Sequence, residues 1–172
     1  MIDQARASRL ASQAFDLWQS GKGAEAVPLY EQSLTLANPS HYRLPDYHGE
    51  LACVLSELGR FPQARSQLEQ SLRVTQDQGA AEGSIGVVIA RYLLADHLLG
   101  QQQPQEALQV IEPSLVRGME SEWLLRLAKA TALHALGRID EARHEAAIAL
   151  ETAPSSQKRK ELAELLANLQ LP

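Results

Sequence analysis

The sequence of 172 residues is poor in cysteine and lacks long apolar runs. Its single cysteine, Cys53, cannot form an intrachain disulfide, so nothing in the sequence favours an oxidising compartment. No stretch approaches the roughly 18 apolar residues that a membrane-spanning helix needs. The first residues, Met1–Arg6, contain no apolar signal region. We therefore expect a cytoplasmic protein that does not enter a membrane.

Basic residues are also scarce relative to acidic ones. The chain has 16 Lys and Arg against 21 Asp and Glu, which gives a formal net charge of −5. Its basic run, Lys158–Lys160, stands at the start of an expected helix and is interpreted as a solvated helix end. Binding of nucleic acid or of an anionic membrane would require a basic stripe. The charge pattern therefore argues against both partners.

Aromatic residues make up only 5% of the chain, and β-branched residues are few, whereas Leu and Ala are abundant. Leu and Ala lose little conformational freedom on entering a helix, while β-branched side chains lose rotamer freedom there. This composition favours an all-α protein. Because large aromatic side chains are rare, the helices must pack through small and medium residues, which brings their backbones close together.

Four segments share one pattern of small and large residues. Each begins with an alanine that is followed by a leucine three residues later, a second alanine after twelve and a second leucine after twenty. The first alanines are Ala14, Ala52, Ala95 and Ala130, and the second alanines are Ala26, Ala64, Ala107 and Ala142. Glycine stands seven residues after the first alanine at Gly21, Gly59 and Gly137, and Gln102 takes that place in the third segment.

Helix packing explains this pattern. The first alanine and its leucine lie on one helical face and contact the partner helix. Glycine ends the first helix, because a left-handed backbone conformation is unstrained only without a Cβ atom. The second alanine marks the crossing of two antiparallel helices, and the residues four and seven positions later continue the buried stripe.

The pattern resembles the tetratricopeptide repeat, a helical hairpin of 34 residues, over about residues 7–156. The resemblance implies a right-handed α-solenoid in a single domain, 1–172, with nine helices. The expected repeats are about 7–40, 45–78, 88–121 and 123–156, followed by a capping helix at about 156–170. The spacing is uneven, so extra residues are expected between hairpins, at about 39–44 and 79–86. Residues 75–83 look like the longer variants found in bacterial regulators.

The helix boundaries follow from local signals. Asn38-Pro39 and Ala153-Pro154 are expected to end second helices, because proline disfavours helix in the preceding residue. Ser84 and Ser155 are candidate N-caps. The run Ile85–Ile89 favours the start of a helix, with a short buried strand as the alternative. The last helix, with leucines on one side, is expected to cap the solenoid and to have no binding function of its own.

Catalytic and metal-binding patterns are weak. His41, Asp46 and His48 fall close together in an expected loop, and two histidines with a carboxylate can bind a metal. Their spacing fits no tight-binding motif, so we interpret them as solvated loop residues. No phosphate-binding glycine loop, paired cysteine motif or nucleophile elbow occurs. We expect no enzymatic activity, no cofactor and no metal.

In the resembled family, the first helix of each hairpin lines a concave groove. Carried over by position, the groove residues used as the candidate site are Phe15, Trp18, Asp46, Glu50, Cys53, Glu57, Tyr92, Asp96, Leu127, Thr131 and His134. The predicted groove contains carboxylates but no lysine or arginine, and it contains large apolar groups. These features indicate a protein or peptide partner with apolar anchors and basic flanks. The alternative is that the apolar residues form core covered by the chain itself.

The resemblance leaves several functions open. A non-enzymatic adaptor or regulatory scaffold that binds a peptide or protein is the main hypothesis. A small secretion-type chaperone or a toxin-inhibiting partner protein is a second, and a self-associating structural scaffold is a third. One subgroup of the family binds a C-terminal carboxylate through Lys, Asn and Arg, and this chain excludes that mode. The matching positions are Ala11, Phe15, Glu50, Ile89 and Leu93.

Overall fold

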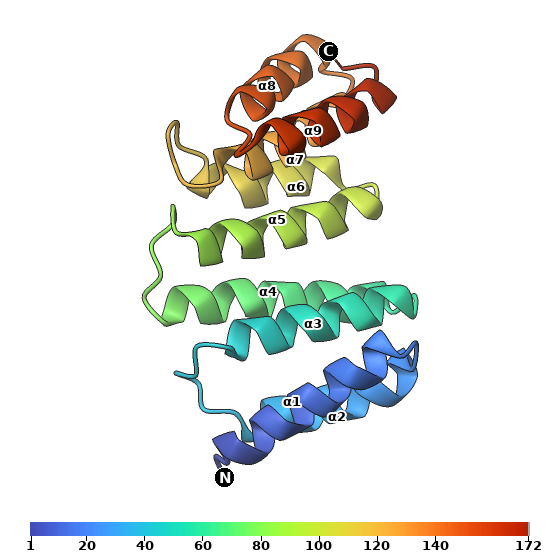
Figure 1. The fold of residues 1–172 in the computed structure, drawn as a ribbon, viewed down its shortest axis with the longest axis vertical. Helices are drawn as coiled ribbons and strands as arrows, with labels where there is room; N and C mark the ends of the chain where they lie inside the picture. The colour runs from blue at the N-terminus through green and yellow to red at the C-terminus, as the bar shows by residue number, and fades with distance from the viewer. Residues whose placement is uncertain (172) are drawn as a thin grey trace. The chain divides into compact units, whose positions relative to one another are not determined.

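The computed structural model describes residues 1–171, and regular secondary structure in that range is entirely helical. The nine α-helices are α1 (Gln4–Gln19), α2 (Gly23–Leu36), α3 (Leu44–Glu57), α4 (Phe61–Asp77), α5 (Ile85–Gly100), α6 (Pro104–Ile111), α7 (Glu122–Ala135), α8 (Ile139–Glu151) and α9 (Ser156–Asn168) (Figure 1). A short 3-10 helix, η1 (Glu112–Ser114), follows α6. The predicted all-α fold is confirmed, and residues 85–89 begin a helix rather than form a strand.

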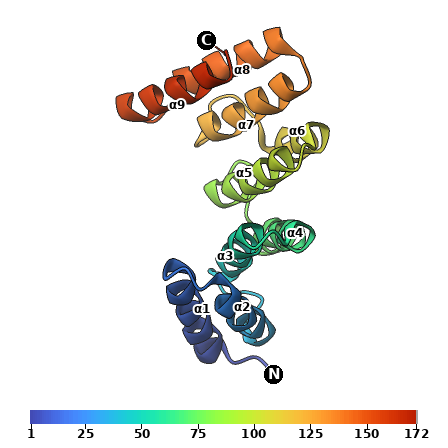
Figure 2. The ribbon, with the colours of Figure 1, turned by 90° about the vertical axis from the view of Figure 1, so that its right-hand side faces the viewer.

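The helices group into two compact units. Met1–Gly79 contain α1–α4, and the second unit begins at Ala80 and contains α5–α9. In the first unit, α1 packs on α2 and α3 on α4, and α2 contacts α3 (Figure 2). In the second unit, α5 packs on α6 and α7 on α8, while α9 contacts α8. Consecutive helices therefore form the expected hairpins within each unit.

The repeat alanines lie at the helix crossings. All eight are no more than 1% exposed to solvent. The residues four positions after each second alanine, Tyr30, Leu68, Ile111 and Ala146, are also buried. The predicted register is therefore confirmed, since a shift of one position would move these side chains off the buried face.

Three hairpins share a buried serine that the repeat pattern places seven residues after the second alanine. The Ser33 hydroxyl donates to the Ala7 carbonyl at 2.8 Å, and the Ser71 hydroxyl donates to the Pro45 carbonyl at 2.9 Å. Ser114 donates to the carbonyl of Glu82 at 2.7 Å. Each bond joins the second helix, or its 3-10 extension, to the beginning of the first helix of the same hairpin or, for Ser114, to the loop just before α5. A hydroxyl buried in this way needs such a partner.

The turn between the two helices of each hairpin has the same backbone geometry in all four repeats. Gly21, Gly59 and Gly137 have φ values of 76°, 72° and 73°, and Gln102 has a φ of 59°. The amide of the residue that follows each of them donates to a carbonyl five residues earlier, at 2.8–2.9 Å. This is the hydrogen bond of a Schellman turn. The hydrogen bonds therefore hold Gln102 in a conformation that normally favours glycine.

Two local expectations are wrong. The second helix of the third repeat was expected to continue through Ser114, but α6 ends at Ile111 and η1 follows. Pro113 explains the early end, because it cannot donate the hydrogen bond that an α-helix requires. Ser84 stands before α5 but forms no side-chain cap, and its hydroxyl oxygen is buried without a hydrogen-bond partner among the described residues. Ser155 does cap α9, accepting from the Lys158 amide at 3.1 Å.

Replacing Ala142 by leucine is expected to lower the free energy of unfolding by about 1–3 kcal/mol, because the larger side chain overpacks the crossing of α7 and α8. Urea denaturation of Ala142→Leu and of the wild type measures this difference. Ala147→Leu on the exposed face of α8 is the matched control and should change stability little. Equal stability of the two variants would show that the register at this crossing is wrong.

Replacing Gln102 by glycine is expected to raise the free energy of unfolding by up to about 1 kcal/mol. The substitution removes the left-handed strain on a residue with a Cβ atom, although glycine gains some freedom in the unfolded chain. The reverse substitution at the equivalent turn, Gly137→Gln, should destabilise the protein. Thermal melts of both variants test the pair, and a destabilised Gln102→Gly variant would contradict the strain argument.

Candidate partner-binding surface

The second unit contains a cavity of about 500 Å³ between three helices. Helix α5 contributes Tyr92, Asp96, Leu99 and Gly100, helix α7 contributes Leu127, Ala128 and Thr131, and helix α9 contributes Leu165, Asn168 and Leu169. Its volume lies within the range of about 300–1,000 Å³ that is typical of ligand-binding clefts. We call these residues the α5–α7–α9 cavity. It brings together four of the predicted site residues, namely Tyr92, Asp96, Leu127 and Thr131.

The walls of the α5–α7–α9 cavity are mostly apolar. Leu127 is only 7% exposed, so it belongs to the packed wall of the cavity and does not offer an exposed apolar contact. For Leu127, this agrees with the alternative that the apolar residues form core. Tyr92 and Leu99 are half-buried, and Leu165 is 45% exposed. The Thr131 hydroxyl donates to the Leu127 carbonyl at 3.0 Å and is thus satisfied within α7. The exposed apolar surface of this cavity therefore comes from α5 and α9.

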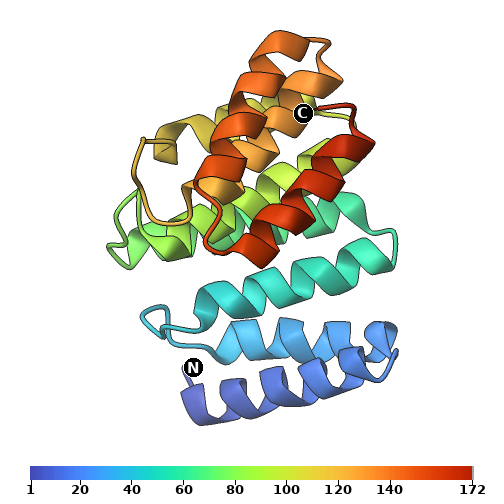
Figure 3. The same ribbon diagram turned by 45° about the horizontal axis from the view of Figure 1, so that its top comes forward.

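Helix α9 packs on its unit and also lines the α5–α7–α9 cavity. Leu162 and Leu166 are buried, and Leu165 and Leu169 lie on the α5–α7–α9 cavity. Figure 3 shows α9 beside α8, on which it packs, and Lys158 of α9 also lies 5.7 Å from the centroid of the Trp123 ring on α7. The expectation that α9 has no binding function of its own stays a prediction, but α9 does supply one wall of the cavity.

Asp96 is the one charged side chain in the lining of this cavity. Burial raises the pKa of its carboxyl group, and the neighbouring His97 opposes the shift. Burial together with the charge of Asp96 also raises the pKa of the Tyr92 hydroxyl. Among the described residues, no hydrogen bond or ion pair joins Asp96 to another side chain. Burial disfavours the charged form of this carboxyl group, and an added cation would favour it.

In the first unit, three predicted residues contact one another. The rings of Phe15 and Trp18 on α1 lie 5.8 Å apart between centroids, edge to face at 87°. The Trp18 indole nitrogen donates to a Glu57 carboxylate oxygen on α3 at 2.9 Å. Trp18 is therefore half-buried and held in place, whereas Phe15 remains 40% exposed.

Glu50 on α3 is paired within the protein. Its carboxylate accepts a hydrogen bond from the Tyr30 hydroxyl at 3.0 Å and from an Arg43 nitrogen at 3.2 Å, and Arg43 also lies 3.6 Å from Asp46. Burial raises the pKa of the Glu50 carboxyl, and the bonds from Tyr30 and Arg43 oppose that shift. Phe15, Arg43 and Glu50 all line a cavity of about 320 Å³ in this unit. The expectation that no cation compensates the groove carboxylates is wrong here, because Arg43 does so.

The remaining predicted residues are less distinctive. Cys53 on α3 and His134 on α7 are half-buried and line neither of these two cavities. His48 has its Nδ1 atom 2.7 Å from the Gln67 side-chain oxygen, so its ring is engaged between α3 and α4. Within residues 1–171, no group of three or more His, Cys, Asp and Glu residues is arranged to hold a metal.

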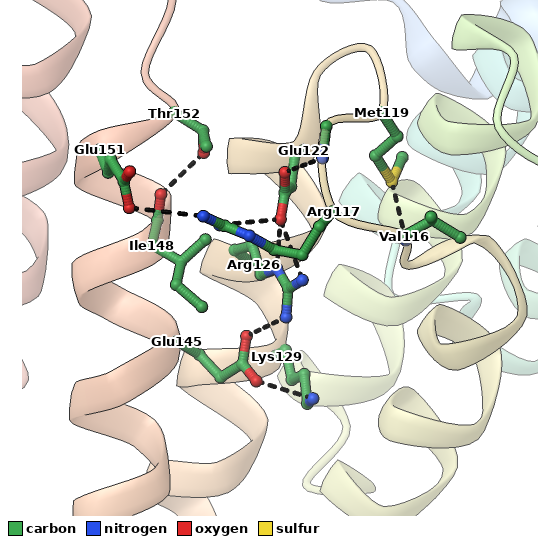
Figure 4. Close-up of polar contacts among 11 residues, drawn as sticks. Val116, Arg117, Met119, Glu122, Arg126, Lys129, Glu145, Ile148, Glu151 and Thr152 are labelled. Carbon is green, nitrogen blue, oxygen red and sulfur yellow. Dashed lines mark hydrogen bonds and ion pairs between the residues drawn. The ribbon is translucent and has the colours of Figure 1, made fainter.

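A buried ion network fixes α7, the helix that carries Leu127 and Thr131 (Figure 4). Arg126 is 2.9 Å from Glu122 on the same helix and 2.7 Å from Glu145 on α8, and all three side chains are buried. Lys129 also lies 2.7 Å from Glu145. The Gly118 amide, in the loop before α7, donates to Glu122 at 2.7 Å. The network therefore joins α7 to α8 and to the preceding loop.

Sequence reasoning missed this network, although a signal was present. Arg126 occupies a position where the resembled family often has a bulky aromatic residue, and Glu122 stands one helical turn before it. Arg91 occupies the same position in the third repeat and is also buried. It donates three hydrogen bonds of 2.8–3.0 Å to the Glu82 carboxylate and one of 2.8 Å to the Val110 carbonyl. Arginine on a buried stripe, with a carboxylate in reach, indicates an internal ion pair.

Removing the central cation should destabilise the second unit. Arg126→Leu is expected to lower the free energy of unfolding by about 3–5 kcal/mol, because Glu122 and Glu145 then remain buried with fewer partners. Arg138→Leu, which breaks the solvent-exposed pair with Glu141, should cost much less, because water screens that pair. Urea denaturation of both variants tests the difference, and equal losses would contradict a structural role for the network.

The same network predicts an acid dependence. Burial alone would raise the pKa values of Glu122 and Glu145, but the Gly118 amide, Arg126 and Lys129 hold both below the ordinary value. Their stabilising contribution is therefore complete above the unfolded carboxyl pKa of about 4.3 and is lost as the pH falls through the lower folded values. This loss should be smaller in Arg126→Leu than in the wild type.

Comparison with known proteins identifies the class. Two family models, both described as tetratricopeptide repeat, match residues 4–77 and 92–157. The chain belongs to the tetratricopeptide repeat family, whose fold is that of a scaffold for protein–protein interaction. None of the curated proteins matches it. Within residues 1–171, no helix is long and apolar enough to cross a membrane.

Solved structures share the fold of this chain. The tetratricopeptide-like repeats of a kinesin light chain from Podosopora anserina match with a TM-score of 0.69 at 20% identity, covering 99% of this chain and 97% of that one. MamA from Desulfovibrio magneticus RS-1 matches with a TM-score of 0.66 at 14% identity, covering 96% and 93%. YrrB, described as having an unusual peptide-binding site, matches with a TM-score of 0.61 at 19% identity, covering 94% and 84%. These likenesses establish an all-α solenoid fold.

Proposed function

We propose that this chain is a non-enzymatic adaptor or regulatory scaffold that binds a segment of a partner protein on its first helices, α1, α3, α5 and α7. The observation that carries the proposal is the α5–α7–α9 cavity, which combines apolar walls with one unpaired carboxylate. Apolar surface that a folded chain leaves open at a concave site usually marks a place of interaction. The half-exposed Phe15 in the first unit adds a second apolar group on the first helices.

The structure refines the chemistry expected of the partner. Apolar anchors remain the proposed source of affinity, with Phe15 and Tyr92 as the groups that receive them. Basic flanks are supported at Asp96, which lacks an ion pair among the described residues. They are less supported at Glu50 and Asp46, whose charges Arg43 already offsets. A cytoplasmic location, a chaperone-like role and self-association remain predictions from the sequence.

Affinity capture tests this proposal. The immobilised chain is incubated with native lysate, and the retained proteins are compared between the wild type and the double variant Phe15→Ala/Tyr92→Ala. Truncation of aromatic anchors is expected to weaken binding by about 2 kcal/mol for each true anchor, so specific partners should be lost. Tyr42→Ala, in the exposed loop before α3, is the matched control. Melting curves of all three proteins exclude unfolding as the cause.

Two outcomes would contradict the proposal. If the double variant retains the same proteins in the same amounts as the wild type, the first helices are not the binding surface. If only the chain itself is recovered, and light scattering shows an oligomer, the self-associating scaffold becomes the better account.

A further inference from the structure

The α5–α7–α9 cavity has an unusual distribution of charge. Asp96 is its one charged lining residue, and the other lining residues that reach solvent are apolar or uncharged. Most of the ion pairs in the second unit lie on α7, α8 and the loop before α7, as the pairs of Arg117, Lys129 and Glu145 show. None of the ion pairs found among the described residues reaches Asp96. The lining of the cavity therefore holds one carboxylate and no lysine or arginine, and the charge known to act on that carboxylate is that of the neighbouring His97.

The apolar part of the cavity is also incomplete. Helix α9 buries Leu162 and Leu166 against its own unit, but Leu165 is 45% exposed where it faces the cavity. Tyr92 and Leu99 on the opposite wall are half-buried. The cavity volume of about 500 Å³ can accept a large side chain together with part of its neighbours. A bulky apolar group placed there would cover these three side chains.

We propose that the α5–α7–α9 cavity is a bipartite docking site for a partner segment that presents a large apolar side chain and, within one helical turn of it, a lysine or arginine. The apolar side chain enters between α9 and α5, and the cation pairs with Asp96. This inference rests on the proposed function and assigns to α9 a role as a binding element. It differs from groove binding by the first helices alone, because one wall belongs to the C-terminal helix.

Charge complementarity selects this occupant over others. A carboxylate beside apolar walls repels an acidic segment, since bringing like charges together with loss of water is unfavourable. A purely apolar segment would bury Asp96 without a partner, which is also costly. A segment with both features satisfies the carboxylate and covers Leu165. A second copy of this chain or a small amphiphile would fill the same space, and both are distinguished by the test below.

The test uses a phage-displayed library of random 16-residue peptides selected on the whole 172-residue chain. The best peptide is synthesised with a fluorescent label, and its affinity is measured by anisotropy. The expected peptides combine a Leu, Ile, Met, Phe or Trp with a nearby Lys or Arg. Asp96→Asn and Leu165→Ser should each weaken binding by about tenfold, at the scale of an anchor contact. Raising the salt concentration should weaken the wild type more than Asp96→Asn.

Matched controls keep the test specific. Asp140→Asn changes an exposed aspartate on α8, and Val116→Ser changes an exposed apolar residue in the loop before α7, both away from the cavity. Neither should alter the affinity more than about twofold. Exchanging the two charges tests the ion pair directly. A peptide with its basic residue changed to Glu should bind the Asp96→Lys variant better than it binds the wild type. Both cavity residues are exposed, so their variants should fold, and melting curves verify this.

The outcomes separate this inference from the proposed function. Peptides that lack a basic residue, or that bind Asp96→Asn and Leu165→Ser as tightly as the wild type, would overturn the bipartite site. The broader proposal would survive if Phe15→Ala/Tyr92→Ala still abolished partner capture. Failure to enrich any peptide, with capture unaffected by that double variant, would reject both. Dimerisation lost in Leu165→Ser would instead assign the cavity to a second copy of the chain.

Discussion

The close approach of two helices at an alanine is the constraint on which each hairpin depends. Ala26, Ala64, Ala107 and Ala142 are fully buried, and each second helix reaches its partner through one of them. A larger residue there would separate the backbones and leave gaps that the sparse aromatic residues could not fill. The interface between its two helices buries only part of the apolar surface of a hairpin. The rest is buried when the hairpin stacks on a neighbouring hairpin, as in other repeat proteins. Stability and binding surface therefore arise from the same packing.

Polar bonds hold the hairpins in register, and the fourth repeat does this differently from the others. Ser33 and Ser71 each bond the second helix to a backbone carbonyl at the beginning of the first, and Ser114 bonds η1 to the loop just before α5. Ala149 stands at the equivalent position in the fourth repeat and has no hydroxyl. There the Arg126–Glu145 ion pair joins α7 to α8 instead. A buried ion pair whose charged groups are all paired can join two helices in place of a neutral hydrogen bond.

The sequence was sufficient to predict the features that are local and periodic. The buried alanines, the turns at Gly21, Gly59 and Gly137 and the number of helices all follow from spacing along the chain. Pro113 also indicates the early end of α6, although the repeat pattern led us to expect a longer helix. The turn at Gln102 was less clear, because hydrogen bonds and not the residue type hold its left-handed backbone. Periodicity alone could not have shown this.

The pairing of individual charges was not predictable, because it depends on contacts between distant residues. Tyr30 reaches Glu50 from 20 positions away, and Trp18 reaches Glu57 from 39. The position of α9 beside Tyr92 and Asp96 depends on how the last helix folds back on its unit, which no repeat pattern specifies. Hence the sequence identified most of the lining residues on α5 and α7 but not the wall that α9 supplies.

The number of groove carboxylates is a poor guide to the charge that a partner would need, because some of these carboxylates are already paired inside the protein. A carboxylate already bonded inside the protein, such as Glu50 with Arg43 and Tyr30, gains little from an added cation, because part of its field is offset and new contacts must replace existing ones. A carboxylate without such bonds, such as Asp96, can pair with an added cation without giving up an existing hydrogen bond. Selectivity therefore depends on which charges the fold leaves unpaired and not on the net charge of the surface. By that criterion Asp96 and its apolar neighbours are the part of the surface on which the proposed docking site depends.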